Sequence, residues 1–212
     1  MQRSVPALAK NVFAGPYKLV RPLARPIISP PPCDVFINHR GIDTKRTIAG
    51  LLFHHLSMLR MRPFLDSKNM KPGDNLYDKI DTAIRGCKLG VAVFSPRYCE
   101  SPFCLHELAL LMESKKRVIP IFCDVKPSEL RVMNSPNASY SQSELERYEK
   151  ALQEAKYTVG LTFDCVKGDW SEFLQTASDA IFENLIELEG DQLDDIKSNT
   201  YYDLKDNNPK HL

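Results

Sequence analysis

The sequence predicts an α/β fold in which helices cover both faces of a parallel sheet. Short apolar runs such as "KLGVAVFS" (88–95) and "RVIPIFCDV" (117–125) show no alternation of polar and apolar residues, which is typical of strands buried on both faces. These runs alternate along the chain with longer segments whose apolar residues recur at helical spacing. The two observations together favour a doubly wound, five-stranded parallel sheet.

The elements are expected in a regular order from Cys33 onward. "CDVFIN" is rich in β-branched and aromatic residues and predicts the first strand, and "DTKRTIAGLLFHHLSML" after it has helical apolar spacing. Ser101 and Pro102 mark the start of the third helix, as N-cap and first helical residue. The fifth strand is weaker because "LTFD" is short. The expected strands are 33–38, 62–66, 88–95, 117–125 and 161–164, and the expected helices are 43–59, 74–86, 101–115, 143–158 and 171–189.

The composition is that of one domain with balanced charge. At 212 residues and 43% hydrophobic, the chain can bury the core of one α/β domain. Its 28 basic and 27 acidic residues leave a net charge of +1, so nucleic acid and anionic membranes are not expected partners. The sequence has no apolar stretch of membrane-spanning length and no signal-peptide core, which favours a cytoplasmic protein. The six cysteines form no CxxC pair, so reduced thiols and no metal site are expected.

The chain divides into three expected parts. Residues 1–32 are basic, lack acidic residues and end in a proline cluster, which predicts a disordered leader, with an organelle transit peptide as the alternative. Residues 33–188 span the folded domain. Residues 189–212 are polar without a periodic apolar face, which predicts a C-terminal tail.

Four blocks of sequence occur in a recognisable order: "CDVFINHRGIDTK", "FLDSKNMKPGDNL", "VAVFSPRYCESPFCLHEL" and "RVIPIFCDVKPSELR". Over residues 33–188 the chain resembles a plant Toll/interleukin-1 receptor (TIR) domain of the TIR-only type. The resemblance implies a flavodoxin-like sheet and an NAD⁺ glycohydrolase that releases nicotinamide and ADP-ribose or cyclic ADP-ribose isomers in plant immune and cell-death signalling. NAD⁺ is then the substrate, and no cofactor is expected.

The same resemblance points to the residues of the site. The family's catalytic glutamate stands in a WCLxEL-type motif, which reads "FCLHEL" here, so catalysis is assigned to Glu107 and stacking on the substrate to Phe103, in place of a tryptophan. The family's FRGxDTR run reads "HRGIDTK" in this chain. Substrate binding is assigned to this run, through Arg40, Gly41, Ile42, Asp43, Thr44 and Lys45. Lysine binds a diphosphate only as a point charge, so the contact of Lys45 is expected to be weaker than an arginine's.

The residues alone also favour a ligand site at the end of the first strand. Open parallel sheets bind ligands there, and Asp43 or Thr44 could cap the next helix while Arg40 and Lys45 meet a phosphate. A capped helix with solvated charges is the plainer interpretation. Glu107 should reach the same edge, where a carboxylate could stabilise the positive charge left on ribose as nicotinamide departs. By position alone, a surface or helix-dipole carboxylate is the commoner interpretation of Glu107.

Self-association is expected to accompany activity. The resemblance implies a homo-oligomer formed through TIR–TIR contacts, with other TIR domains as further partners. It also implies that the loop "LDSKNMKPGDN" (65–75) gates the site and contacts neighbouring copies. Gly50 and Leu51 stand where the family often has a Ser-His pair that packs against a neighbour, so that face loses polar contacts.

Two other functions are weighed against the enzyme. A non-enzymatic TIR adaptor is favoured by the absence of the tryptophan and of the Ser-His pair, whereas Glu107 favours catalysis. A phosphoacceptor receiver domain needs an acidic pair after the first strand and an aspartate ending the third. Here those strands run into Asn38-His39 and Ser95-Pro96, so that function is not supported.

Two further groups of residues are expected to be structural. His54 and His55 are neighbours on a helix and point in different directions, so they do not form a shared metal site. Cys99 and Cys104 have no base placed beside them by the sequence and are expected to be packed thiols and not nucleophiles.

Overall fold

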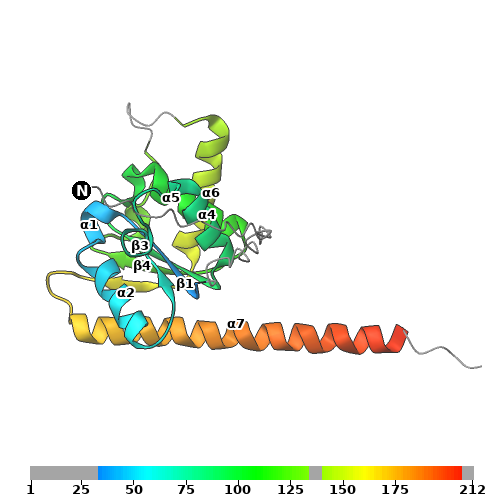
Figure 1. The fold of residues 1–212 in the computed structure, drawn as a ribbon. Coiled ribbons are helices and arrows are strands. Elements are labelled where there is room, and N and C mark those ends of the chain that lie inside the picture. The colour runs from blue at the N-terminus through cyan, green and yellow to red at the C-terminus, as the bar shows by residue number, and fades with distance from the viewer. Residues whose placement is uncertain (1–32, 134–139, 207–212) are drawn as a thin grey trace, which may run out of the picture. The chain divides into compact units, whose positions relative to one another are not determined.

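Five parallel strands form the sheet at the centre of the fold (Figure 1). The computed structural model describes the backbone of residues 33–133 and 140–206 and side chains as far as residue 191, so the expected leader at 1–32 lies outside the described residues. The strand order is β2-β1-β3-β4-β5, and every pair is parallel. This is the flavodoxin-like order, and it confirms the predicted fold class. The strands are β1 (Val35–His39), β2 (Pro63–Phe64), β3 (Leu89–Phe94), β4 (Arg117–Cys123) and β5 (Leu161–Phe163).

The helices follow the strands as the sequence predicts, with additional short turns at the loops. The short elements are α1 (Gly41–Thr44), α3 (Asp66–Asn69) and two 3₁₀ turns, Tyr98–Glu100 and Pro127–Glu129. The long helices are α2 (Ile48–Met58), α4 (Leu76–Gly86), α5 (Pro102–Glu113), α6 (Gln142–Tyr157) and α7 (Trp170–Asp206). Ser101 caps α5 as expected, since its side chain accepts the N–H of Cys104 at 3.3 Å.

Two apolar layers enclose the sheet. Helices α2 and α7 cover one face and α4, α5 and α6 the other, as Figure 1 shows. Successive residues of β1 point to opposite faces, so Val35 and Ile37 pack toward α2 and α7, while Phe36 packs toward α4 and α5. Asn38 follows the same alternation and points to the α5 side, which decides where the polar site forms.

The first expected helix, 43–59, is divided in two. Residues 41–44 form the single turn α1, and α2 begins only at Ile48. The expectation that Asp43 or Thr44 caps this helix is wrong. The side chain of Thr44 is buried and donates to the carbonyl oxygen of Arg40 at 3.0 Å, while that of Asp43 is engaged by Arg97.

The division between α1 and α2 explains why residue 50 is a glycine. A Cβ atom added at Gly50 would lie 2.6 Å from the carbonyl oxygen of Lys45. The chain between α1 and α2 therefore folds closely against α2 only because residue 50 lacks a side chain. Leu51 beside it is 42% exposed.

The last helix is longer than the sequence predicts. The helix was expected to end at 189 and to be followed by a polar tail, but α7 continues through Gly190 to Asp206. A glycine inside a helix costs about 1 kcal/mol relative to alanine, and the following residues include good helix formers such as Leu, Gln and Lys. Because the first half of α7 is already fixed by packing of Phe173, Ala177 and Ile181 on the sheet, propagation past Gly190 needs no new nucleus.

Within the described part of the chain, none of the helices combines the length and the apolar character that crossing a membrane requires.

Candidate functional site

The loops after β1 and β3 meet at the carboxyl edge of the sheet. The thiol of Cys104, in the first turn of α5, lies 3.3 Å from the carbonyl oxygen of His39 at the end of β1. The side-chain amide of Asn38 donates to the carbonyl oxygen of Cys104 at 3.2 Å. These contacts fix the start of α5 against β1, so residues 107 and 38 face one another although they are far apart in the sequence.

Glu107 is a half-buried carboxylate held by one side chain of the core. Its Oε2 accepts a hydrogen bond of 2.7 Å from Nδ2 of Asn38, and Asn38 itself is fully buried. A side chain pointing at solvent would need no such partner. The surface-carboxylate interpretation therefore does not describe Glu107.

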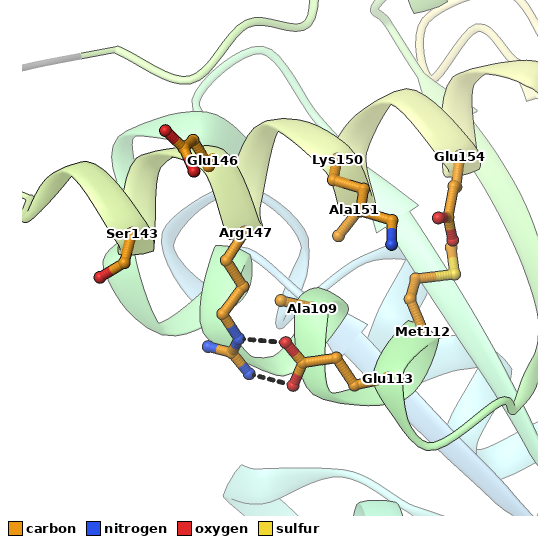
Figure 2. A pocket seen from close by; sticks show the side chains of 9 residues that line it. All are labelled: Ala109, Met112, Glu113, Ser143, Glu146, Arg147, Lys150, Ala151 and Glu154. Atoms are coloured by element: carbon orange, nitrogen blue, oxygen red, sulfur yellow. Dashed lines mark hydrogen bonds and ion pairs between the residues drawn. The ribbon is translucent and has the colours of Figure 1, made fainter.

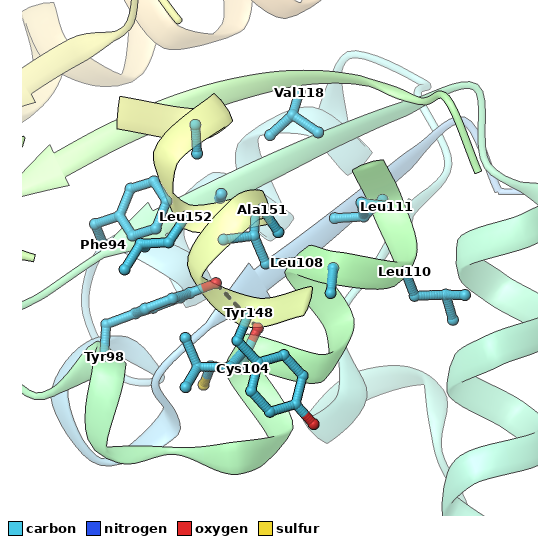
Figure 3. Packing of buried hydrophobic residues seen from close by; sticks show 14 of the residues in the cluster. Phe94, Tyr98, Cys104, Leu108, Leu110, Leu111, Val118, Tyr148, Ala151 and Leu152 are labelled. Carbon is cyan, nitrogen blue, oxygen red and sulfur yellow. Dashed lines mark hydrogen bonds between the residues drawn. The ribbon is translucent and has the colours of Figure 1, made fainter. Parts of the chain in front are cut away.

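A buried tyrosine holds Asn38 in turn. The hydroxyl of Tyr98 donates to Oδ1 of Asn38 and lies 3.1 Å from the carbonyl oxygen of Cys104. Figure 3 shows the contact between Tyr98 and Cys104 inside the apolar cluster that also contains Phe94 and Leu108. Burial raises the pKa of Tyr98 well above its usual value, so the hydroxyl remains a donor. Because Tyr98 fixes the amide oxygen of Asn38, the amide nitrogen is directed at Glu107.

The environment of Glu107 disfavours its charge in the absence of a ligand. Burial is the main reason that its pKa is raised to about 8; the hydrogen bond from Asn38 opposes the rise, and the negative charges of Asp66 and Asp81 contribute to it. A carboxyl group with such a pKa at the ligand-binding edge of a parallel sheet is a candidate for function. A cationic ligand beside it would favour the ionised form.

The loop after β1 presents basic groups of two kinds. The guanidinium of Arg40 is half-buried, and its Nε is buried without a hydrogen-bond partner among the described residues. Lys45 is exposed and Ile42 is 65% exposed. A buried unpaired donor is rare in proteins, and an anionic ligand would satisfy it. Arg40 is therefore the better candidate of the two cations for binding an anion.

The backbone N–H groups of this loop are less available for binding a phosphate than the sequence suggested. The N–H groups of Asp43 and Thr44 both donate to the carbonyl oxygen of Arg40 at 3.0 Å, so they are not free to bind a phosphate. The carboxylate of Asp43 accepts from Ser95 Oγ at 2.7 Å and from Nε of Arg97 at 2.8 Å. Asp43 thus ties this loop to the loop after β3 and has a supporting position. Gly41 is half-buried, and an added Cβ atom there would meet no other atom within 4 Å.

Phe103 presents an aromatic surface on the outer side of α5. It is 43% exposed and stacks on Tyr77 of α4 with 5.6 Å between ring centroids and 26° between ring planes. Since Tyr77 covers part of the ring, Phe103 offers a pre-positioned flat face and not a free side chain.

Sequence reasoning missed three residues at this site: Asn38, Tyr98 and Asp66. Asn38 is the next-to-last residue of β1, and a polar residue in this buried strand was an available signal. Tyr98 lies in a short turn and gave no periodic signal. Asp66 begins α3 in the expected gating loop, and its charge acts on both Glu107 and His39.

The other sulfur and nitrogen candidates do not join the site as reactive groups. Burial raises the pKa of Cys99 to about 11 and that of Cys104 to about 12, so neither is a thiolate near neutral pH. His54 is exposed and its neighbour His55 half-buried. Among the described residues, the one cluster with three metal-type ligands is Cys123, Asp124 and Cys165, whose ligand atoms lie within 4.8 Å of one another.

A separate pocket lies between α5 and α6. It has a volume of about 390 Å³, and Figure 2 shows that polar and charged side chains line it together with Ala109, Met112 and Ala151. Arg147 and Glu113 form an ion pair across it, with a 2.8 Å hydrogen bond between Nη2 and Oε2. Neither Glu107 nor Arg40 lines this pocket, so it is distinct from the site at the sheet edge.

Comparisons with known proteins agree on the family. A TIR domain family model matches residues 33–199. A protein from Brachypodium distachyon named "Probable 2' cyclic ADP-D-ribose synthase BdTIR" is 50% identical over 158 residues, covering 74% of this chain and 70% of that protein. TMV resistance protein N from Nicotiana glutinosa is 38% identical over 102 residues, which are 46% of this chain but only 9% of that longer protein. The TIR domains in the structure of the activated Roq1 resistosome superpose with a TM-score of 0.61 at 28% identity, over 70% of this chain and 99% of that chain.

Proposed function

Because this chain belongs to the TIR domain family, we propose that it cleaves NAD⁺ at the bond between nicotinamide and ribose. The observation that carries the proposal is the half-buried carboxylate of Glu107, held by Asn38 at the edge of the sheet where parallel α/β folds bind ligands. A relative that is 50% identical is named for the synthesis of a cyclic ADP-ribose, which supports the same substrate.

The main contribution of the protein to the reaction is electrostatic stabilisation of the charge that forms on the ribose. When the bond breaks, its electron pair moves to the ring nitrogen of nicotinamide and neutralises the positive charge there. The ribose carbon is left with positive charge, and the carboxylate of Glu107 stabilises it. Nicotinamide needs no general acid to depart, so a single carboxylate is sufficient where most glycosidases use two.

The other residues bind and orient NAD⁺. Arg40 meets the diphosphate with its unpaired guanidinium nitrogen, and Lys45 adds a weaker contact from the exposed end of the loop. Gly41, Ile42, Asp43 and Thr44 shape the binding loop, and Phe103 supplies a face for stacking on a ring of the substrate. NAD⁺ is consumed as substrate, and the reaction uses no bound cofactor or metal.

The products follow from what reaches the ribose carbon next. Addition of water with loss of a proton gives ADP-ribose, and addition of an oxygen or nitrogen atom from elsewhere in the same nucleotide gives a cyclic isomer. The name of the Brachypodium relative supports a cyclic product as one outcome for this chain.

Activity accompanies self-association in this proposal. Helices α2 and α7 expose large apolar side chains such as Met58 on α2 and Phe182 on α7, at 73% and 54%, which copies of the chain could bury on contact. The Roq1 structure has TIR domains within an assembly, which supports homo-oligomers and contacts with other TIR domains. Resemblance to plant disease resistance proteins supports a role in immune signalling. We extend the proposal to cell-death signalling in the cytoplasm.

Incubation of the purified protein with NAD⁺, with products separated by mass and retention, tests the proposal. Glu107→Gln keeps the hydrogen bond from Asn38 but removes the charge, so nicotinamide release should fall about a hundred- to a thousandfold in kcat with KM little changed.

Glu113→Gln is the matched control. Glu113 lies on the same helix but in an exposed ion pair with Arg147, so this variant should retain the parental rate. A parent protein that self-associates but releases no nicotinamide would instead be a TIR adaptor. A Glu107→Gln variant with the parental rate would remove Glu107 from the mechanism.

A further inference from the structure

Two thiols meet at the carboxyl edge of the sheet, outside the Glu107 site. Cys123 is the last residue of β4 and is buried, and Cys165 follows the end of β5 by two residues and is half-buried. Their Sγ atoms lie 2.7 Å apart. The two residues are separated by 42 positions in the sequence, so the fold and not the local chain brings them together.

Backbone hydrogen bonds hold the two loops in this arrangement. The N–H of Asp124 donates to the carbonyl oxygen of Phe163 at 3.0 Å, and the carboxylate of Asp124 accepts the N–H of Cys165 at 2.8 Å. In addition, the N–H of Gly168 donates to the carbonyl oxygen of Asp164 at 2.8 Å and closes the loop that carries Cys165. The sulfur atoms are therefore pre-positioned by the folded backbone.

The contact fits a covalent bond between the sulfurs better than a shared metal ion. A tetrahedral zinc ion with Zn–S bonds of about 2.3 Å keeps two sulfur ligands about 3.8 Å apart. The observed 2.7 Å is much shorter, and the carboxylate of Asp124 is already engaged by the backbone of Cys165. Three of the other four described thiols behave differently, since those of Cys33, Cys87 and Cys104 lie against backbone carbonyl oxygens.

We propose that Cys123 and Cys165 are a thiol–disulfide modification site that a low-molecular-weight disulfide such as oxidised glutathione converts to a reversible intramolecular disulfide. The thiolate of Cys165, the less buried of the two, attacks one sulfur of oxidised glutathione and releases one glutathione thiolate. Cys123 then attacks the Cys165 sulfur of this mixed disulfide and releases the second glutathione. The two protein thiols lose two protons and two electrons in total, and oxidised glutathione becomes two molecules of glutathione.

The surroundings make the first step slow near neutral pH. Burial raises the pKa of both thiols, and the neighbouring carboxylate of Asp124 raises that of Cys165 further. Attack requires the thiolate, so the rate of oxidation should rise about tenfold for each pH unit between pH 7 and 9. Once a mixed disulfide forms on Cys165, the adjacent Cys123 should resolve it quickly.

The disulfide would fasten the edge of the fold. It would link the end of β4 to the loop between β5 and α7, across 42 residues of chain. Closing a loop of that size restricts the unfolded chain, and the melting temperature should rise by about 5–10 °C. The site is independent of NAD⁺ cleavage, because neither thiol contacts Glu107, Asn38 or Arg40.

The test is treatment of the full chain with oxidised glutathione, followed by alkylation of free thiols in denaturant and peptide mapping by mass spectrometry. The expected product lacks two hydrogens, resists alkylation only at Cys123 and Cys165, and returns to six free thiols with dithiothreitol. In Cys123→Ser, one glutathione should remain attached to Cys165, because the resolving thiol is absent. Treatment of Cys165→Ser with oxidised glutathione should change neither the melting temperature of this variant nor the alkylation of Cys123.

Three results would overturn the proposal. One is a parent protein that retains glutathione on Cys165 without releasing it. Another is a disulfide that maps to different cysteines. The third is protection of both thiols by one equivalent of zinc in the reduced protein, which would make the cluster a metal site. The mapping of the parent protein decides the matter even where the serine variant at the buried position 123 fails to fold.

Discussion

The loops after β1 and β3 lie at one edge of the sheet but present their functional groups differently. Glu107, on the helix after β3, is held by Asn38, which is itself held by the buried Tyr98. Arg40, in the loop after β1, has a buried Nε without a hydrogen-bond partner among the described side chains, and Lys45 is exposed. The acid is therefore positioned before any ligand arrives, whereas the cations are left for the ligand to engage. Contacts with the core thus pre-organise the catalytic carboxylate, whereas the cations of the loop after β1 are available to bind the substrate.

Removing the side chain of Asn38 should disturb the pre-organised position of Glu107. In Asn38→Ala, Glu107 loses its hydrogen bond and Tyr98 loses its acceptor, so kcat for nicotinamide release should fall about tenfold to a hundredfold. The pKa of Glu107 should rise, because the hydrogen bond from Asn38 lowers it. The pH–rate profile of the variant should therefore move to higher pH.

Asn38→Ser distinguishes positioning from folding, since serine retains a hydrogen-bond donor and should recover part of the rate. An Asn38→Ala protein that is folded, by melting temperature and circular dichroism, and has the parental pH–rate profile would show that Asn38 does not position Glu107.

Changes at Arg40 should affect the binding of NAD⁺ instead. Arg40→Gln should raise KM for NAD⁺ about tenfold and leave kcat nearly unchanged, because a charge-assisted hydrogen bond to the diphosphate is lost in ground and transition states alike. Lys45→Gln is the matched control and should have a smaller effect, since Lys45 is exposed. Steady-state kinetics check both, and an equal loss at the two positions would contradict the difference between them.

The smallest effect is expected at Phe103. Phe103→Ala should lower kcat/KM about threefold to fivefold, because stacking on an aromatic face contributes a modest free energy. Phe103→Trp keeps the face and should preserve or raise the rate. Equal values of kcat/KM for all three proteins would place Phe103 outside the substrate site and leave it as a partner of Tyr77 alone.

Much of the fold could be predicted from the sequence because local pattern and global packing agree. Apolar strands without alternation, such as Leu89–Phe94, indicated a sheet covered on both faces, and the observed strand order confirms it. The division of the first helix was not predictable, since it depends on the approach of Gly50 to a backbone oxygen. The end of α7 was misplaced because the polar residues from 189 onward show no periodic apolar face, while packing of the earlier turns extends the helix beyond Gly190.

The candidate site shows where sequence reasoning is limited. Family motifs pointed to Glu107 and Arg40, and the structure brings their loops together, although their roles stay predictions until activity is measured. Asn38 offered only the signal of a polar residue in a buried strand, and Tyr98 offered none. The roles of both come from contacts between strand, turn and helix. Asp43 was expected to cap a helix but binds Arg97, a partner that only the tertiary fold supplies.

The raised pKa of Glu107 makes the stability of the folded protein depend on pH. The folded protein retains a proton on Glu107 between its ordinary pKa and about 8, whereas the unfolded chain has lost it. Stability therefore falls as pH rises through this window, and Glu107→Gln should be more stable than the parent near pH 8 but not near pH 4. Catalysis has the opposite requirement, because only the ionised carboxylate stabilises a ribosyl cation.

The pH dependence of nicotinamide release by the parent protein tests whether Glu107 is the catalytic carboxylate. The profile of kcat/KM reports the free protein and should rise to a plateau with an apparent pKa near 8. The profile of kcat should rise at lower pH, because the positive charge of bound NAD⁺ favours the carboxylate. In Glu107→Gln, the rate should be small and independent of pH. A parent profile that is flat from pH 6 to 9, or one that Glu107→Gln reproduces, would contradict the assignment of Glu107 as the catalytic carboxylate.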